Sequence, residues 1–433
     1  MEINYIDLFC GLGGMRLGFE SAMKSMGLSG GAVFSSEIKR RAIEAYRRNF
    51  GEIPDGDITQ TAAADVPDFD FLLAGFPCQA FSSAGRRMGF EDARGTLFFD
   101  VARILKEKKP RGFLLENVEG LVSHDGKRTL AAMSRMLSDL GYRAGWEVLD
   151  GRDFGLAQSR RRIYIFGALG RRARLGGFAP RHSNLSKILD PAAPAKETEF
   201  AKKLLRHCSA KDAAGKKIND KRGGPGNIHS WDFGLKGEVS AAQKELLSLL
   251  LKQRRNKKWA EMHGVEWMDG MPLTLGMISS FFDSGDTGIL KEMLDDLVSK
   301  GYLAYEHPKK KDGAKRVPDT GKPRGYNIVT GKLSFEYSKI LDPQGIAPTL
   351  VATDAARLGV PAHGGIRPLT VREGLRLFGF PESYSLDFLK PKEAFDLLGN
   401  TVCVPVVEYV AKGLLESVFS EEGADAGIAG ATV

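Results

Sequence analysis

The sequence predicts an α/β fold in which a doubly wound, mostly parallel sheet carries a smaller inserted domain. Three observations lead to this prediction. Short apolar runs alternate with amphipathic helical patterns as far as about residue 170, the alternation then stops in a stretch rich in arginine, glycine and proline, and a mixed helical and apolar pattern returns near the C-terminus. Strands that alternate with helices are typical of parallel sheets.

The apolar runs of the first part predict buried strands, with helices between them. We expect strands at Tyr5–Phe9, Ala32–Ser36, Phe69–Ala74, Gly112–Leu115 and Ile163–Gly167. We expect helices from about Met15 and over Arg40–Phe50, Leu97–Lys108 and Leu130–Leu140. Together these elements define a first domain over residues 1–175.

The middle of the chain, residues 176–390, is predicted to be a separate insert. Arg171–Arg181 and Lys211–Asn227 have the composition of linkers. Helical periodicity returns at Ala241–Lys252, and a mixed αβ pattern returns at Leu369–Phe378 and Val402–Leu415. Residues 391–420 are expected to rejoin the first domain, and residues 421–433 to form a disordered tail.

Composition restricts the partners of the chain. Its 433 residues correspond to two or three domains and carry a net charge of +8. This excess favours a polyanion, although binding to a ribosome or a membrane surface would also fit. Because no apolar run is long enough to cross a bilayer and the N-terminus lacks the pattern of a signal peptide, we expect a cytoplasmic monomer without membrane association.

A glycine-rich turn follows the first predicted strand. It runs from Asp7 to Gly14, and it opens a helix. Such a turn lets the backbone approach a nucleotide-like ligand, and Glu37, at the end of the next strand, can accept hydrogen bonds from a pair of ribose hydroxyls. The alternative is an ordinary tight turn with a surface glutamate.

Cys78 stands out among the four cysteines. The others, Cys10, Cys208 and Cys403, are scattered, and no paired spacing suggests a disulfide framework or a metal site. Cys78 lies in Pro77-Cys78-Gln79, directly after the strand Phe69–Ala74, where α/β sheets place their sites. A thiolate is a good nucleophile at neutral pH, although a buried structural cysteine is the commoner case.

Two further polar clusters lie at strand ends. Glu116 and Asn117 end the strand Gly112–Leu115, and a glutamate there can act as an acid if its pKa is raised. Arg160 and Arg162 precede the strand Ile163–Gly167 and would share one side of it. The alternatives are an exposed carboxylate and a solvated run of charge.

In this order the motifs resemble those of the cytosine-C5 DNA methyltransferase family, in its bacterial restriction-modification type. The resemblance covers roughly residues 3–168 and 345–415. Its motifs are Asp7–Gly14, Gly56-Asp57-Ile58, Pro77-Cys78-Gln79, Gly95–Asp100, Glu116-Asn117-Val118, Gln158–Arg162, Arg367–Glu373 and Gly399–Val402.

The resemblance implies transfer of a methyl group from S-adenosyl-L-methionine to C5 of a cytosine that is flipped out of a specific, short duplex DNA sequence. Cys78 would be the nucleophile that adds to C6, and Glu116 would contact N3 and the exocyclic amine. Arg162 would lie near the base carbonyl with Arg160 as its helper, and Asn117 would orient the site. Because no side-chain base is evident for the C5 proton, we expect a bound water to remove it.

The resemblance also implies a set of cofactor contacts. Phe9 would pack on the adenine, Glu37 would bind the ribose, and Asp57 would accept from the adenine amine beside the Ile58 backbone. Ile38 stands where many family members have an aromatic residue. The remaining expected contacts are Gly11, Leu12, Gly13, Gly14, Pro77, Leu97, Asn400 and Val402.

The insert corresponds to the family's variable target-recognition region and matches no family motif. Residues 270–330 resemble a winged-helix module, because two predicted helices, Leu273–Phe282 and Leu290–Lys300, precede a strand at residues 301–306 and a basic loop, Lys309–Arg324. A returning strand is expected at Tyr326–Val329. This loop would lie along DNA phosphates; the alternative is a generic helical insert with a solvated loop.

Three other functions fit part of the pattern. An RNA cytosine methyltransferase would share the catalytic motifs, and a DNA-binding regulator would have lost the activity. An NAD-dependent oxidoreductase would share only the glycine turn. If a matching restriction endonuclease exists, it would act separately.

Overall fold

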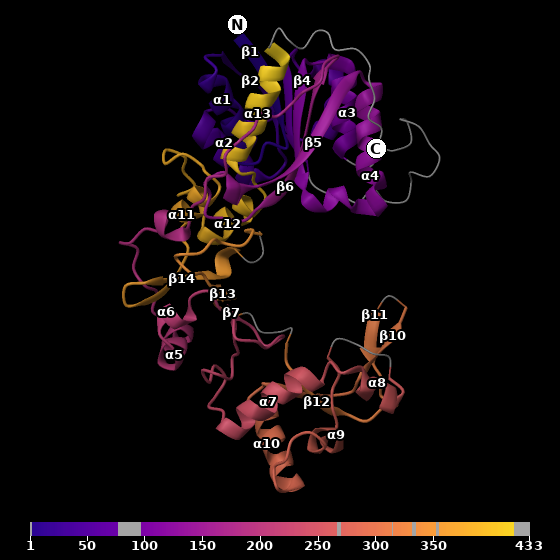
Figure 1. Cartoon of the computed structure of the whole chain (residues 1–433), viewed down its shortest axis with the longest axis vertical. Coiled ribbons are helices and arrows are strands. Elements are labelled where there is room, and N and C mark those ends of the chain that lie inside the picture. Colours follow the sequence, from indigo (N-terminus) through magenta and orange to yellow (C-terminus); the bar gives the residue numbers. More distant parts are fainter. Residues whose placement is uncertain are drawn as a thin grey trace. The chain divides into compact units, whose positions relative to one another are not determined.

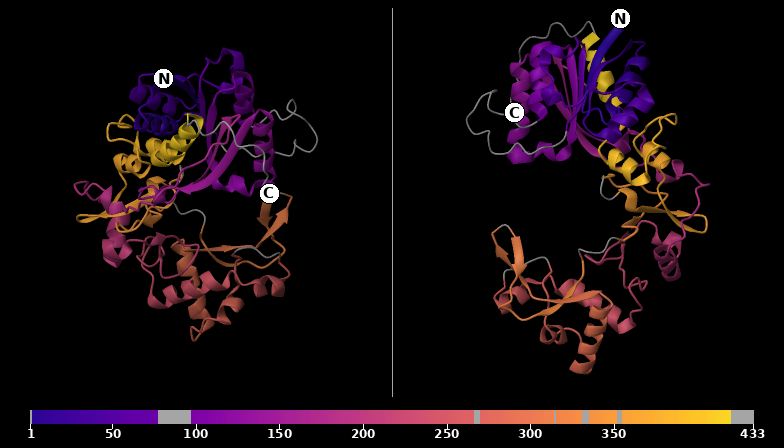
Figure 2. Two further views of the ribbon diagram at one scale, coloured as in Figure 1. Left: turned by 45° about the horizontal axis from the view of Figure 1, so that its top comes forward. Right: turned by 180° about the vertical axis from the view of Figure 1, so that it is seen from behind.

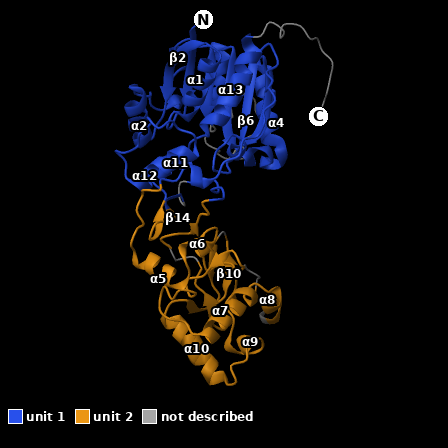
Figure 3. Ribbon diagram, turned by 60° about the vertical axis from the view of Figure 1, so that its left-hand side comes forward, with its two compact units in different colours: residues 1–190, 344–356, 369–433 blue, residues 191–343, 357–368 orange. Residues whose placement is uncertain are grey.

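The computed structural model describes residues 2–76, 97–265, 270–313, 315–330, 335–351 and 355–419. The chain forms two compact units (Figure 3). Unit 1 comprises residues 1–190, 344–356 and 369–433, and unit 2 comprises residues 191–343 and 357–368. This division differs from the predicted one, because residues 176–190, 344–356 and 369–390 group with the first unit and not with the insert. The tail, 421–433, lies outside the described residues.

Unit 1 contains a six-stranded sheet in the order β2-β1-β3-β4-β6-β5. The first four strands in this order are parallel, and β6 is antiparallel to both β4 and β5. The strands are β1 (Glu2–Leu8), β2 (Ser29–Ser36), β3 (Phe71–Gly75), β4 (Gly112–Val118), β5 (Tyr142–Asp150) and β6 (Arg161–Leu169). The predicted doubly wound, mostly parallel sheet is therefore confirmed.

Helices cover both faces of this sheet (Figure 1), and the view from behind shows the same layers (Figure 2). One face is covered by α1 (Gly14–Ser25), α2 (Arg40–Phe50) and α13 (Val404–Phe419), and the other by α3 (Leu97–Lys108) and α4 (Arg128–Asp139). Phe98, Val101 and Met133 pack in the second layer against buried sheet residues such as Leu115. Burial of these apolar side chains fixes the helices on the sheet.

The helical predictions for unit 1 agree closely with the structure, and one strand was missed. Arg40–Phe50 and Leu97–Lys108 have the predicted bounds. The strand β5 was not predicted, because this edge strand buries only its two ends and has no continuous apolar run. It pairs with β6 throughout its length and extends the sheet beyond β6.

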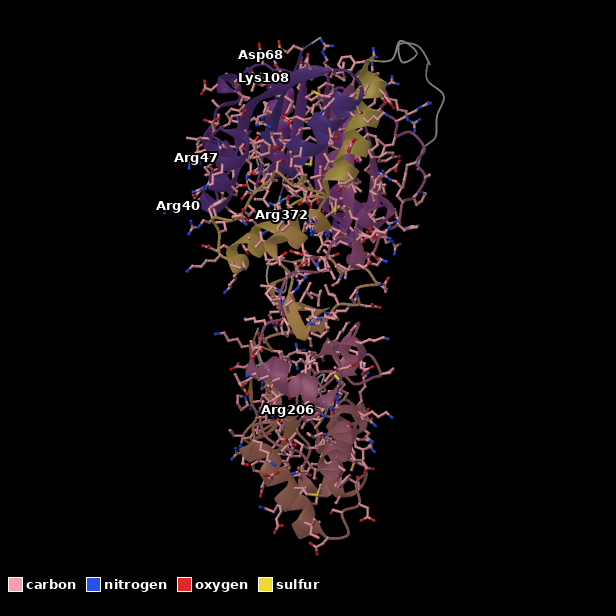
Figure 4. All side chains as sticks on the ribbon, turned by 90° about the vertical axis from the view of Figure 1, so that its left-hand side faces the viewer. Arg40, Arg47, Asp68, Lys108, Arg206 and Arg372 are labelled. Carbon is pink, nitrogen blue, oxygen red and sulfur yellow. The ribbon has the colours of Figure 1, made fainter. Side chains whose placement is uncertain are left out.

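The C-terminal part of unit 1 contains α11 (Val371–Leu377) and α12 (Pro391–Gly399) before α13. Thr370 caps α11 in a capping box with Glu373, and Pro391 begins α12. Ion pairs lie at the surface of unit 1; the Nζ atom of Lys108, for example, lies 3.2 Å from Oδ1 of Asp68 (Figure 4). No helix among the described residues is both long and apolar enough to cross a membrane.

Unit 2 contains a small sheet and a helical part. The sheet has the order β15-β14-β13-β7-β8. Its strands are β7 (Lys217–Ile218), β8 (Asn227–Ile228), β13 (Lys339–Ile340), β14 (Leu358–Ala362) and β15 (Gly365–Pro368), and the helices α5 (Glu199–His207) and α6 (Ala210–Ala213) precede it. Phe200 and Leu204 of α5 pack with Ile218 and Ile340 in a common core.

The helical part of unit 2 has its own core around Leu246, Leu294 and Tyr302. It contains α7 (Ala241–Gln253), α8 (Lys257–His263), α9 (Leu275–Ser279), α10 (Thr287–Ser299), β9 (Leu303–Glu306), β10 (Lys309–Asp312), β11 (Lys315–Pro318) and β12 (Gly325–Ile328). The strands β9 and β12 pair antiparallel, and Leu273 bridges to Tyr326 beside them. The segment that was expected to be a loop, Lys309–Arg324, contains the antiparallel hairpin β10–β11.

Candidate active site

A cavity of about 340 Å³ lies within unit 1 at the carboxyl ends of its parallel strands. The glycine turn after β1, the ends of β2, β3 and β4, the start of β6 and the segment after α12 all contribute to its wall. Ligand sites of open α/β sheets lie at this edge. The fold therefore gathers segments that are far apart in the sequence around one cavity.

The turn after β1 has an unusual backbone. Phe9, Gly11 and Gly13 all have positive φ angles, of 57°, 54° and 70°. Phe9 and Gly11 line the cavity, but Gly13 does not. A Cβ atom on Gly13 would lie 2.4 Å from the ring of Phe50, so a glycine is required here for the turn to pack against α2.

Glu37 lies at the wall beside the turn, and its carboxylate is held by backbone groups. Gly11 donates to Oε2 at 3.0 Å, and the amides of Ile38 and Lys39 donate to Oε1 at 2.8 Å. Oε1 thus accepts two hydrogen bonds and Oε2 one, so Oε2 keeps a lone pair that can accept a hydrogen bond from a bound molecule. Ile38 also lines the cavity and is 70% exposed, as a residue at the mouth of a pocket would be.

Besides Gly13, two of the predicted cofactor residues, Asp57 and Ile58, do not line this cavity. Asp57 is exposed and caps a short helical turn, where its Oδ1 accepts from the amide and the hydroxyl of Thr59. Ile58 is buried in the core under α3. The other predicted contacts that line the cavity are Leu12, Gly14, Leu97, Asn400 and Val402.

Glu116 and Arg162 form an ion pair at the wall formed by β4 and β6. Glu116 Oε1 lies 3.1 Å from Arg162 Nε, and both side chains are largely buried. Burial raises the pKa of Glu116 above its usual range, although the positive charges of Arg162 and Arg160 oppose this rise. Val118 stands opposite Arg162 in the antiparallel register of β4 and β6. Glu116 lies two residues before Val118 on the same face of β4, so its side chain is close to that of Arg162.

Asn117 connects the ends of two neighbouring strands. Its Nδ2 donates to the carbonyl of Phe76 at 3.0 Å, and its Oδ1 accepts from the amide of Val118. Gly75, at the end of β3, is in register with Glu116. Asn117 therefore fixes the chain where it leaves β3. Pro77 and Cys78 follow directly, and they lie outside the described residues.

Arg160 is buried and bonded to the backbone. It donates to the carbonyls of Leu350, Gly399 and Thr401, the last at 2.6 Å. The sequence predicts that Arg160 assists Arg162. In the structure, the hydrogen bonds of Arg160 also hold the segment after α12 at the cavity wall. Sequence reasoning missed Thr401 and Leu397 as wall residues, although Thr401 lies within the motif Gly399–Val402 and Leu397 lies just before it.

Among the described residues there is no cluster of histidine, cysteine or carboxylate side chains that could hold a metal ion. The cavity thus presents an aromatic ring, a carboxylate held by backbone amides, and a buried acid beside an arginine. This set can hold a nucleoside with free hydroxyls and protonate a heterocyclic ring nitrogen.

Comparison with known proteins identifies the family. The family of C-5 cytosine-specific DNA methylases matches residues 3–416. The chain is 52% identical to the Type II methyltransferase M.NlaIV of Neisseria lactamica, over 96% of this chain and all of that protein. It is 39% identical to the Type II methyltransferase M.BanI of Aneurinibacillus aneurinilyticus, over 97% of each chain.

A solved structure shows the same fold. It is a DNA modification methyltransferase encoded within an Escherichia coli prophage, and it matches with a TM-score of 0.52 and 20% identity over 96% of this chain and 99% of that chain. The predicted resemblance is confirmed, and the RNA-modifying, regulatory and oxidoreductase alternatives are not supported. The chain belongs to the C-5 cytosine-specific DNA methylase family and is a DNA (cytosine-5-)-methyltransferase.

Proposed function

We propose that this enzyme transfers a methyl group from S-adenosyl-L-methionine to C5 of one flipped-out cytosine in a short duplex DNA sequence, as the modification enzyme of a restriction-modification system. The observation that carries the proposal is the pairing of Glu116 with Arg162 in the cavity that also contains Phe9 and Glu37. The relatives of this chain are described as Type II methyltransferases, which supports a role in a restriction-modification system.

The residues of the cavity fit S-adenosylmethionine. Phe9 offers a ring for the adenine, Glu37 offers its Oε2 to the ribose hydroxyls, and the glycine turn lets the backbone approach closely. Asn400 and Val402 would close the site. When bound, S-adenosylmethionine supplies an electrophilic methyl group. Asp57 and Ile58, which do not line the cavity, are not needed for this assignment.

Cys78 is the proposed nucleophile. Its sulfur adds to C6 of the cytosine as a thiolate, and the C5–C6 double bond of the ring is lost, so that C5 becomes electron-rich enough to accept a methyl group. Removal of the C5 proton by water then restores the double bond, and the thiolate leaves. The cytosine must leave the base stack for this addition, at a cost of a few kcal/mol.

Glu116 is the proposed acid. Addition of the thiolate puts negative charge on the ring, and a proton from Glu116 to N3 stabilises the adduct. Burial raises the pKa of this carboxyl and so favours the protonated form that an acid requires. Arg162 balances the charge of this group and approaches the base carbonyl, whereas Arg160 and Asn117 position the surrounding backbone.

Unit 2 is the proposed target-recognition domain, and its helical part is the proposed winged-helix module. The order of α7, Leu273, α9, α10, β9, the hairpin β10–β11 and β12 supports this assignment. A common core joins these elements, except for the hairpin β10–β11. The hairpin, rich in lysine, would be the wing and contact phosphates.

A trapping experiment tests the catalytic proposal. DNA with 5-fluorocytosine at the target position should give a covalent complex that survives a denaturing gel and requires S-adenosylmethionine, because fluorine cannot leave C5 as a cation. Cys78→Ala should give no such band and should lower methyl transfer by much more than tenfold, while DNA binding persists. An equal band with Cys78→Ala would assign the nucleophile to another residue.

A further inference from the structure

The helix that would enter the major groove in a winged-helix module is acidic here. Glu292 and Asp295 are exposed on α10, and Asp286 caps its start. The one cation within the helix, Lys291, lies 2.6 Å from Asp295. Phosphates line both sides of the major groove, so they would repel the negative charges of α10 if this helix lay there. Base contacts must therefore come from another segment.

The loop between β7 and β8 has the opposite charge. Residues Asn219–Asn227 surround a hollow of about 590 Å³ in unit 2. Its lining includes Lys217, Lys221 and Arg222, and the loop's only acid, Asp220, is buried, with its carboxylate bonded to the amide and hydroxyl of Ser230. The accessible charge of the loop is therefore purely positive.

The backbone of this loop, by contrast, is fixed by polar contacts. Asn219 Oδ1 accepts from the amides of Lys221 and Arg222, and Asn227 Nδ2 donates to the carbonyl of Asn219 at 2.8 Å. The carbonyl of Lys221 accepts from Arg255 at 2.6 Å, and that of Arg222 lies 3.2 Å from His229 Nε2. A fixed backbone loses little entropy on binding, as a recognition loop requires.

The side chains on this backbone remain available. Lys217, Lys221 and Arg222 are exposed, and none forms an ion pair with the described residues. Gly224 has a φ angle of 123°, and a Cβ atom on Gly224 or Gly226 would have no neighbour within 4 Å among the described residues. The glycines therefore leave room for a ligand to approach the backbone closely.

We propose that the loop Asn219–Asn227 reads the target sequence in the major groove, with Arg222 donating to O6 and N7 of a guanine and Lys217 and Lys221 contacting the flanking phosphates. This inference rests on the proposed function of unit 2. A bidentate bond from arginine to guanine is the commonest base-specific contact of proteins, and a guanidinium held on a fixed turn fits its geometry. The wing then positions the duplex without reading it.

Binding and methylation by Arg222→Ala test this assignment. The matched control is Arg206→Ala, which removes the same charge from the exposed face of α5 in unit 2 (Figure 4). The target site is first identified by bisulfite sequencing of DNA methylated by the wild type. Arg222→Ala should weaken binding to that target about 5- to 150-fold and leave a scrambled duplex nearly unaffected. Arg222→Lys should lie between, and Arg206→Ala should match the wild type.

A library of duplexes with one target position randomised at a time identifies the base. Arg222→Ala should relax the preference at one guanine position, as read by bisulfite sequencing. Equal losses on target and scrambled DNA would show a phosphate contact only, and unchanged binding would place the loop away from DNA; either result overturns the assignment. Thermal unfolding verifies that the variants fold. A wild type that transfers no methyl group would instead overturn the proposed function itself.

Discussion

Unit 1 and unit 2 use their positive charges in different ways. Arg160 of unit 1 is buried and bound to carbonyl groups, and Arg162 is largely buried and bound to Glu116. Lys221 and Arg222 of unit 2, like the cations of the hairpin β10–β11, are exposed to solvent. A buried charge with a fixed partner is held in one geometry, as a catalytic group requires. An exposed cation can instead exchange its solvent for the phosphates of a polyanion. Substitutions in unit 1 should therefore change rates and cofactor affinity, and those in unit 2 should change DNA affinity.

The largest effect in this comparison is expected at Glu116. Glu116→Gln keeps the size of the side chain and removes its acid, so the rate of methyl transfer at saturating DNA should fall by about 10²- to 10⁴-fold. Cofactor affinity, measured by calorimetric titration, should change less than threefold, because Glu116 pairs with Arg162 and not with the glycine turn. A large loss of cofactor affinity would move Glu116 to the cofactor side of the cavity.

Glu37 should show the reverse pattern. Glu37→Ala removes the acceptor of the Gly11, Ile38 and Lys39 amides as well as the proposed ribose contact. We expect S-adenosylmethionine to bind about 10- to 100-fold more weakly, since bonds to a charged group contribute about 1.5–3 kcal/mol each. Asp57→Ala is the matched carboxylate control, and calorimetry should show only a small change because Asp57 does not line the cavity. Equal losses would return Asp57 to the cofactor site.

These two carboxylates also show how far the sequence alone can lead. The motifs located Glu37 and Glu116 correctly at the cavity wall, because a strand end fixes where its next residues lie. The same reasoning grouped Asp57 with them, although its side chain bonds to Thr59 and not toward the cavity. Proximity along a motif does not determine the direction of a side chain.

Long-range partners were beyond prediction for a similar reason. The bonds from Arg160 to Leu350, Gly399 and Thr401 join positions separated by 190 to 241 residues, and no local pattern encodes them. The close packing of Gly13 on Phe50 of another helix is likewise not visible in the local sequence. In unit 2, Lys211–Asn227 was interpreted as a linker because its short strands, β7 and β8, are too brief to show periodicity.

Asp7 tests whether the buried charges of unit 1 affect stability. This residue is fully buried in β1, and burial raises its pKa to about 8. The folded state thus keeps a proton that the unfolded chain releases near pH 4, so the stability that this group contributes is present below about pH 4 and is lost as the pH rises to about 8. Asp7→Asn should remove this loss, and its advantage in Tm over the wild type should grow from pH 5 to pH 8.

The control for Asp7 is Asp68→Asn, whose carboxylate is on the surface beside Lys108 (Figure 4). Its side chain is 98% exposed, and its Tm difference from the wild type should stay constant over the same range. A constant difference for Asp7→Asn as well would mean that Asp7 titrates alike in the folded and unfolded states. The contribution of Asp7 to stability would then not depend on pH, and the contrast between unit 1 and unit 2 would apply to function alone.

The smallest expected effect concerns the hairpin β10–β11. Its measurement shows which face of the hairpin contacts DNA. Residues that pair across the strands share a face, so Lys309, Lys311 and Arg316 lie on one side, whereas Lys310 shares the other with Asp312 and Lys315. Lys311 stands directly opposite Arg316, so this face presents two neighbouring cations to a phosphate. Lys310 lies on the other face, where its Nζ is 3.5 Å from Oδ1 of Asp319.

We therefore expect Lys311→Ala with Arg316→Ala to reduce the slope of log affinity against log salt by about two units, since each lost phosphate contact lowers it by roughly 0.9. Target and scrambled DNA should be weakened alike, and methylation at saturating DNA should be close to normal, because phosphate contacts position the duplex without reading it. Lys310→Ala should change the slope by less than half as much. Anisotropy at several salt concentrations measures all of these slopes. If Lys310→Ala gives the larger change, the opposite face of the hairpin lies on the duplex, and if neither variant changes the slope, the cations of this hairpin are solvated and the DNA contacts of unit 2 lie elsewhere.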